Sequence, residues 1–206
     1  EVEVTTLVEV TTIIEVTSYV TEDTSETTPS GEVKYEVDGR EFYWAHEAAF
    51  DFVVYADGVA IDGYTLDAAT PWDAFKANGG GTYKINILVD DEVVASINVN
   101  IVLKGDASLD NKVNGLDASG VLKNYNKAID PKNPDGTGTL SELAMFAGDV
   151  IGTTSGTDSN RQGRDINGLD AAKILQYYNL LMKYDRDGKN TEDPAVISEI
   201  WATVLK

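Results

Sequence analysis

Cysteine is absent from the chain, and histidine occurs once, as His46. Without cysteine the protein has no disulfide framework, no thiol nucleophile and no zinc–thiolate site. His46 stands near Trp44, where a histidine is more typical of packing than of acid–base chemistry, and no serine motif completes a catalytic triad. Carboxylate pairs are frequent, but the predicted β domain is small for an active-site cleft. We therefore expect a protein that is not an enzyme.

Long apolar runs and basic residues are also scarce. No run approaches the roughly 18 apolar residues of a membrane span, so we expect no membrane insertion. Lysine and arginine number 16 against 35 aspartates and glutamates, which gives a net charge of −19. Such a charge argues against nucleic acid as a partner and is compatible with calcium or a basic protein surface. No signal peptide is recognisable, and we expect the chain to be a C-terminal part of a larger protein.

Acidic and hydroxyl side chains alternate within residues 105–117. Oxygen donors stand at the first, third, fifth, seventh, ninth and twelfth places of a twelve-residue loop, which is the spacing of an EF-hand calcium loop. These donors are Asp106, Ser108, Asp110, Lys112 (through its carbonyl), Asn114 and Asp117. Asn111 replaces the usual glycine at the sixth place, and asparagine tolerates the left-handed backbone needed there.

The surroundings of this loop are those of half an EF-hand, and they occur twice. A strand-like segment, residues 95–103, stands where an EF-hand has its first helix. A helix is predicted after the loop from apolar residues at helical spacing, namely Ala118, Val121, Leu122, Tyr125 and Ile129. Residues 113–126 return as residues 166–179, 53 positions later, with Asn-Gly-Leu-Asp-Ala identical in both. We interpret this as an internal duplication.

The second loop has two possible registers. Asp149 follows a glycine as Asp106 does, and it would be the first ligand if ten residues are inserted before the closing Asp170. Alternatively the loop begins at Asp158 and includes Asn160, with only one extra residue. We favour Asp149. In both registers the ion lies near three further residues, Asp165, Asn167 and Asp170.

Two half EF-hands with the pattern Asp…Asp…(Val/Ile)-Asn-Gly-x-Asp, each followed by a short helix, resemble a dockerin. Dockerins attach cellulosomal enzymes and scaffoldins to cohesin domains. The resemblance covers the second half of the chain. It implies two Ca²⁺ ions, a cohesin partner on a scaffoldin or cell-wall anchoring protein, and a secreted, extracellular or cell-surface location. A β-rich module that runs directly into the first loop also resembles the X-module–dockerin tandems of ruminococcal systems.

By this resemblance, cohesin contacts come from the residue before each closing aspartate and from each exit helix. The matching positions are Leu116, Ser119, Lys123 and Lys127, then Leu169, Ala172, Gln176, Tyr177 and Leu180. For the two lysines the alternative is a solvated helix face. Leu180 and Leu181 beside Tyr177 predict that the second helix carries the apolar anchor. The similar faces also allow two binding orientations related by an internal twofold axis.

The expected fold class is α+β in three segments. Residues 1–31 hold three six-residue Val/Thr repeats and a polar connector, predicted to be a β-prone stalk or a linker. Residues 32–104 predict a small immunoglobulin-like β-sandwich, the X-module, that passes without a hinge into the first loop. Residues 105–206 are the helical dockerin, with insertions and a C-terminal helix. The X-module would stabilise the dockerin under load.

Within the sandwich, five strands are predicted at residues 33–37, 41–44, 50–55, 83–89 and 92–103, with one helical turn at 71–77. In the last two strands the odd-numbered apolar residues, Val93 among them, should face the core. Asn86, Asn98 and Asn100 should face outward.

Four further features of the sequence bear on its fold and function. Trp44, Trp72 or Tyr55 could be sugar platforms, so the alternative function is a carbohydrate-binding sandwich attached to a calcium-binding module. Residues 184–190 resemble a third calcium loop but lack a closing carboxylate, which favours a polar turn. A capping box at residues 139–142 predicts a short helix. An apolar stripe predicts a last helix that packs on either domain: Ile197, Ile200, Trp201 and Val204.

Overall fold

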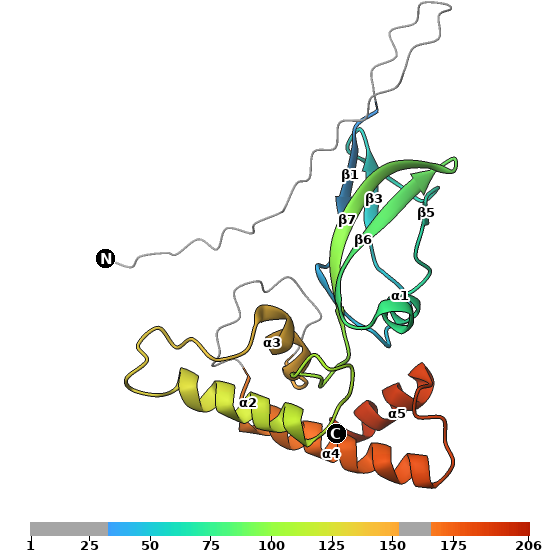
Figure 1. Ribbon diagram of the computed structural model, residues 1–206. Helices are drawn as coiled ribbons and strands as arrows, with labels where there is room; N and C mark the ends of the chain where they lie inside the picture. Colours follow the sequence, from blue (N-terminus) through green and yellow to red (C-terminus); the bar gives the residue numbers. More distant parts are fainter. Residues whose placement is uncertain (1–32, 153–165) are drawn as a thin grey trace, which may run out of the picture.

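A computed structural model describes residues 33–152 and 166–206 of the chain (Figure 1). Within these ranges the fold is α+β, as predicted, with seven strands and five helices. The strands are β1 (Tyr35–Asp38), β2 (Phe42–Trp44), β3 (Val53–Ala56), β4 (Val59–Ile61), β5 (Thr65–Leu66), β6 (Gly81–Val89) and β7 (Glu92–Val102). The helices are α1 (Pro71–Asn78), α2 (Gly115–Ala128), α3 (Glu142–Gly148), α4 (Gly168–Arg186) and α5 (Pro194–Val204). The repeats within residues 1–21 lie outside the described residues.

The strands form two sheets that face each other. One is antiparallel in the order β1-β3-β4, and the other has the order β2-β7-β6-β5, with β2 parallel to β7. Val54 of the first sheet packs against Ile87 and Ala95 of the second. Tyr43 and Ile101 belong to a second apolar cluster of the same β part. The first half of the described chain is therefore a small two-sheet sandwich.

The long β6–β7 hairpin confirms the predicted alternation over most of its length. Ile85 and Ile101 are buried, and Asn98 is exposed on the opposite face. Val93 contradicts the prediction, since 57% of it is exposed. An irregularity just before Leu88 shifts the strand pairing by one residue, which turns Val93 outward.

The other elements of the sandwich differ from the sequence expectations in their bounds. β3 begins at Val53 instead of residue 50, and β4 and β5 were not predicted because they are too short to show alternation. The predicted single turn at residues 71–77 is α1, an eight-residue helix. Its N-cap is Thr70, whose hydroxyl accepts the backbone N–H of Asp73 at 3.0 Å.

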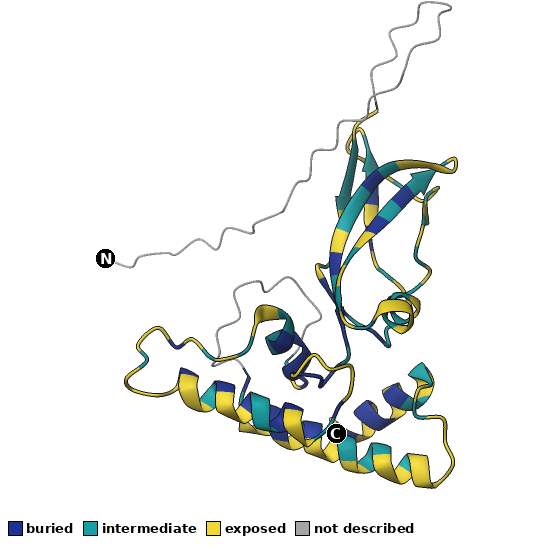
Figure 2. Cartoon of the chain, viewed as in Figure 1, coloured by how far each residue is buried: buried dark blue, intermediate teal, exposed yellow. Residues whose placement is uncertain are grey.

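The helices form a separate core. α2 and α4 lie side by side and run in opposite directions, and α5 packs against α4 (Figure 1). Val121 of α2 and Ile174 of α4 are fully buried between them. The predicted stripe on α5 is buried in the same cluster, so its apolar face points inward (Figure 2).

The predicted apolar face of α2 is wrong in part. Leu122 and Ile129 are 41% and 48% exposed. Asn124 is buried instead, and its side-chain oxygen accepts the backbone N–H groups of Thr139 and Leu140 at 2.7 and 2.9 Å. Because buried polar groups need such partners, Asn124 ties the loop that follows α2 onto the helix.

Two smaller expectations in the helical part also need correction. The cap of α3 is Ser141, whose hydroxyl accepts the N–H of Ala144 at 3.3 Å, whereas the sequence suggested Thr139. Residues 184–186, expected in a polar turn, are the last helical residues of α4, and the turn begins after them at Asp187.

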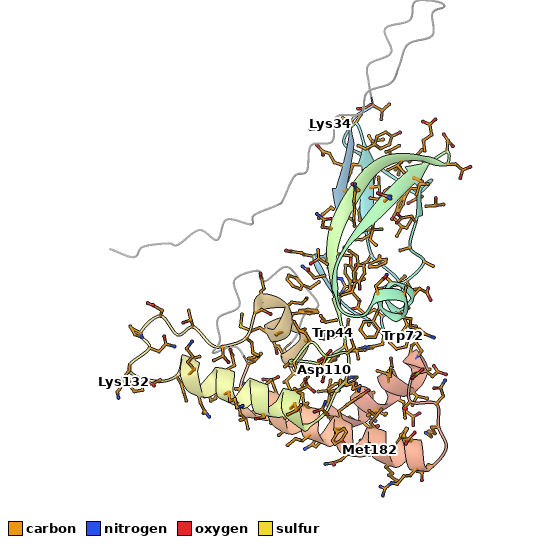
Figure 3. All side chains as sticks on the ribbon, in the orientation of Figure 1. Lys34, Trp44, Trp72, Asp110, Lys132 and Met182 are labelled. Atoms are coloured by element: carbon orange, nitrogen blue, oxygen red, sulfur yellow. The ribbon has the colours of Figure 1, made fainter. Side chains whose placement is uncertain are left out.

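An aromatic cluster joins the sandwich to the helices. Phe146 of α3 lies 5.1 Å from Phe42 and 5.6 Å from Trp44, measured between ring centroids. Lys104, which follows β7, is buried with its ammonium 3.8 Å from the ring of Trp44 and 5.4 Å from that of Trp201. Figure 3 shows Trp44 at this junction. The first loop therefore begins inside the contact between the two parts.

Candidate metal centres

The first loop is wrapped around the carboxylate of Asp106. Its Oδ1 accepts the N–H of Asp110 at 3.1 Å and the hydroxyl of Ser108 at 3.3 Å. Its Oδ2 accepts the N–H of Asn111 at 2.8 Å. Asn111 has a φ of 65°, so the sixth place of the loop is left-handed, as predicted.

Asp117 closes this loop from the first turn of α2. Its Oδ1 accepts the N–H of Ser108 at 2.9 Å, and its Oδ2 accepts the N–H of Asn114 at 2.7 Å. Asn114 is the N-cap of α2, and its side-chain oxygen accepts the N–H of Leu116 at 2.8 Å. This capping box holds the closing carboxylate against the loop.

The carboxylates of the first loop repel one another. Asp106 and Asp117 are 1% and 0% exposed. The pKa of Asp106 is raised to about 6, chiefly by burial and further by the charges of Asp117 and Asp110, while N–H donors oppose the shift. Figure 3 shows Asp110 in the segment between β7 and α2. A cation at this place would offset both the burial and the repulsion.

The second loop repeats the closing geometry. Asp170 Oδ2 accepts the N–H of Asn167 at 2.9 Å, and Oδ1 accepts the N–H of Ile151 at 3.1 Å. Asn167 caps α4 by accepting the N–H of Leu169 at 2.8 Å. Asp170 is 1% exposed, and burial raises its pKa. Both closing aspartates therefore have the same two kinds of backbone donor.

Ile151 relates the register of the second loop to that of the first. It stands two residues after Asp149, as Ser108 stands two residues after Asp106, and both donate their N–H to the closing aspartate. Asp149 is buried at the C-terminus of α3. Of the two registers, this geometry favours Asp149 as the counterpart of Asp106. The remaining predicted ligands, Asp158, Asn160 and Asp165, lie outside the described residues.

The donors present suit a hard divalent cation. In the first loop, carboxylates come with the hydroxyl of Ser108, the amide of Asn114 and the carbonyl of Lys112, a mixed oxygen set of the kind that Ca²⁺ takes. Among the residues that the structure describes, no three His, Cys, Asp or Glu side chains converge closely enough to hold a metal by themselves. A Ca²⁺ ion here would therefore depend on the neutral donors as well as on the aspartates.

The predicted partner-binding residues lie mostly on the surface. Leu116 and Leu169, which precede the two closing aspartates, are 68% and 57% exposed. Also accessible, in whole or in part, are Ser119, Lys123, Lys127, Ala172, Gln176 and Leu180. The ammonium of Lys127 donates to the carbonyl of Gly138 at 3.1 Å, so this lysine holds its own loop as well.

Tyr177 does not belong to this surface. It is 4% exposed and stacks on Trp201 with ring centroids 4.2 Å apart. Leu180 and Leu181 are partly buried against the same core. The large apolar side chains that α4 does expose are Leu169, Leu175 and Met182. The prediction that Tyr177 is available to a partner is therefore wrong, whereas an apolar anchor elsewhere on α4 stays a prediction.

Leu122 and Leu175 form a matched pair that sequence reasoning missed. They occupy the same place in the two repeats, 53 positions apart, and are 41% and 42% exposed. Leu122 Cδ2 stands 3.7 Å from where a Cβ on Gly168 would lie, so Leu122 lies beside the start of α4. The signal available in the sequence was a leucine at the same place in both repeats.

Comparison with known proteins finds no matching family model and no matching curated protein. In the described part of the chain, every helix is too short or too polar to cross a membrane. What the protein does must therefore be inferred from the two loops and from the outer faces of α2 and α4.

Proposed function

We propose that the chain is a calcium-dependent docking module of the dockerin type, which binds a cohesin domain to assemble or anchor a cellulosome. The supporting observation is the equivalence of the two loop closures, in which Asp117 and Asp170 each accept one N–H from their asparagine cap and one from the loop. Two such closures on a pair of antiparallel helices are what two half EF-hands require. The role is binding, without catalysis.

In this proposal, two sets of residues hold Ca²⁺. The first set is Asp106, Ser108, Asp110, Lys112, Asn114 and Asp117, and the described part of the second is Asp149, Asn167 and Asp170. When bound, each ion supplies positive charge that offsets the burial of the aspartates. The chain's own contribution is to hold each closing aspartate at the first turn of a helix. Metal binding and the folding of the helical part are therefore linked.

The outer faces of α2 and α4 would meet the cohesin. Leu116 and Leu122 on α2 match Leu169 and Leu175 on α4 in sequence place and in exposure. Lys123 aligns with Gln176, which breaks the symmetry. Exposed apolar side chains that gather on one surface are typical of a docking site. Because the leucines are duplicated, the cohesin could bind in either of two orientations, with α2 or with α4 making the main contact.

The sandwich would be the X-module that stabilises the dockerin under load. Lys104, Trp44 and Phe146 bury the connection, and the N–H of Gly80 donates to Asn111 Oδ1 at 2.7 Å. A pull on the first loop would therefore reach β6 and β7 without passing through a hinge. The location that fits this role is secreted, extracellular or cell-surface.

Titration calorimetry of the full chain with CaCl₂ tests the proposal directly. We expect two bound ions, and we expect affinity for at least one member of a cohesin panel that is lost when EDTA removes the metal. The double variant Leu116→Ala, Leu169→Ala should weaken the cohesin complex by at least about tenfold. Val59→Ala, an equally exposed position on β4, is the matched control. The absence of any heat of calcium binding would exclude the proposal.

A carbohydrate-binding role is the second candidate, and the larger cleft beside Trp72 favours this residue as the sugar platform. Trp44 is packed between Phe146 and Lys104, whereas Trp72 and Phe75 stack at 5.7 Å along a cleft of about 810 Å³. Tyr55 lies in β3 and does not line this cleft. Retardation in gels containing cellulose or xylan, abolished by Trp72→Ala, would favour this role. Unretarded migration would remove it.

A further inference from the structure

Three lysines meet at a pocket of about 470 Å³ beside the second loop, and we call it the lysine pocket. Lys104 comes from the end of β7, Lys173 from α4 and Lys206 from the segment after α5. This concentration of positive charge is unexpected in a chain with 16 basic and 35 acidic residues.

The three ammonium groups have no carboxylate partner among the residues that the structure describes. Within the described ranges, none of them is in an ion pair, whereas Arg40 and Lys189 both are. The ammonium of Lys173 donates to the carbonyl of Val204 at 2.5 Å, which leaves further N–H donors on the same nitrogen. No carboxylate of the described residues therefore pairs directly with these ammonium groups, and the negative charge that acts on Lys104 is that of Glu47.

Lys104 is the most unusual of the three. The residue is only 7% exposed, and its ammonium lies over the faces of Trp44 and Trp201, 3.8 and 5.4 Å from the ring centroids. Aromatic faces stabilise a cation, but they do not replace the charge-assisted hydrogen bonds that an ammonium forms with an anion. Lys104 lines the pocket, so an anion placed there could supply them.

We propose that the lysine pocket binds a carboxylate group that is carried on a short aliphatic body. The walls between the lysines are apolar, with Leu169 and Leu205 among the lining residues, and they suit such a body. A single negative charge is favoured over a phosphate because Asp149 and Asp170 accept N–H bonds from two lining residues, Gly152 and Ile151. A multiply charged ligand would be repelled more strongly by these aspartates.

Propionate is the probe that tests this site, with neutral propionamide as its matched control. The readout is the indole N–H signals of the three tryptophans in NMR spectra of the full chain, recorded in CaCl₂ at constant ionic strength. Trp44 and Trp201 contact Lys104, while Trp72 lies at the other cleft and serves as the internal reference. We expect the first two signals to shift saturably with propionate, with a dissociation constant on the order of millimolar. Propionamide should leave them unmoved.

Substitutions then assign the effect to the pocket. Lys104→Met should weaken propionate binding by at least about tenfold, since a charge-assisted contact is lost. Lys84→Met, an exposed lysine on β6, removes the same charge outside the pocket and should change nothing. Lys173→Met provides a second test if Lys104→Met does not fold. Equal responses to propionate and propionamide, or unchanged binding in both pocket variants, would overturn the proposal.

Two peptides identify the source of the carboxylate. If the pocket receives an acidic side chain of a protein partner, acetyl-Gly-Glu-Gly-amide should shift the same signals, and acetyl-Gly-Gln-Gly-amide should not. If propionate alone acts, the natural ligand is a free organic acid. A response to both peptides would contradict recognition of a carboxylate.

Discussion

Asp117 combines two roles in one side chain, because its oxygens organise the backbone of the loop and its charge is available to a cation. Asp117→Asn keeps an oxygen acceptor and the size of the side chain but removes the charge. We expect calcium affinity to fall by at least about tenfold, and stability in EDTA to fall by about 1–3 kcal/mol because one of the two backbone N–H groups loses its acceptor. Titration calorimetry measures the calcium affinity, and urea unfolding in EDTA measures the stability. Asp185→Asn, at an exposed position within the last turn of α4, is the control and should bind calcium normally. Equal affinities of the two variants would mean that Asp117 is not a ligand.

The burial of His46 predicts how the stability of the fold depends on pH. Its pKa is lowered to about 4, first by burial and then by the charge of Lys104, and its Nδ1 has no hydrogen-bond partner among the described residues. The unfolded chain takes up this proton near pH 6.5 and the folded chain only near pH 4. The contribution of neutral His46 is therefore complete above pH 6.5 and is lost as pH falls toward 4, by up to about 3 kcal/mol.

His46→Phe keeps the stacking on Trp44, which has a centroid distance of 6.2 Å, and removes the titration. Urea unfolding at several pH values should give the variant a shallower loss of stability between pH 6.5 and 4. Around pH 7.5 the stability of the variant and that of the unmodified protein should change with pH in the same way. Parallel curves across the acidic range would show that His46 takes up its proton at the same pH in the folded and the unfolded chain.

At the scale of helices and strands, the sequence predicted those features that depend on residues close together in the chain. The helices α2, α4 and α5, the long hairpin and the left-handed Asn111 all follow from periodicity, caps or turn residues. The burial of Asn124 could not be predicted, because it depends on a loop packing across α2 from Thr139 onward. Tyr177 was misplaced for the same kind of reason, since its partner Trp201 comes from a helix distant in sequence.

Asn111 connects the first loop to the sandwich through two separate groups. Its N–H donates to Asp106, and its side chain accepts the N–H of Gly80. Asn111→Gly retains the backbone donor and suits the positive φ, so calcium affinity should change less than about threefold. The lost side-chain bond should speed hydrogen exchange at Gly80 by about fivefold, equivalent to about 1 kcal/mol. The buried amide of Val99 is the internal reference. A large loss of calcium affinity would show that the side chain itself serves the ion.

At the scale of the whole molecule, the contacts around Phe146 predict that sandwich and helices unfold together. Phe146 is 2% exposed and contacts Phe42 and Trp44 across the junction. With calcium bound, scanning calorimetry should give one transition whose calorimetric and van't Hoff enthalpies agree. Phe146→Ala removes the shared ring, costs about 3–5 kcal/mol, and should split the transition, with only the helical part remaining sensitive to calcium.

Phe52→Ala is the control for that experiment, because it creates a comparable cavity inside the sandwich alone, where Phe52 stacks on Phe50. It should lower the midpoint and leave a single transition, since the junction is intact. Calcium binds only the folded helical part in this scheme, so raising its concentration should also raise the midpoint of the intact sandwich. Two transitions in the unmodified chain, with the sandwich indifferent to calcium, would show that the direct passage from β7 into Asp106 does not couple the two parts.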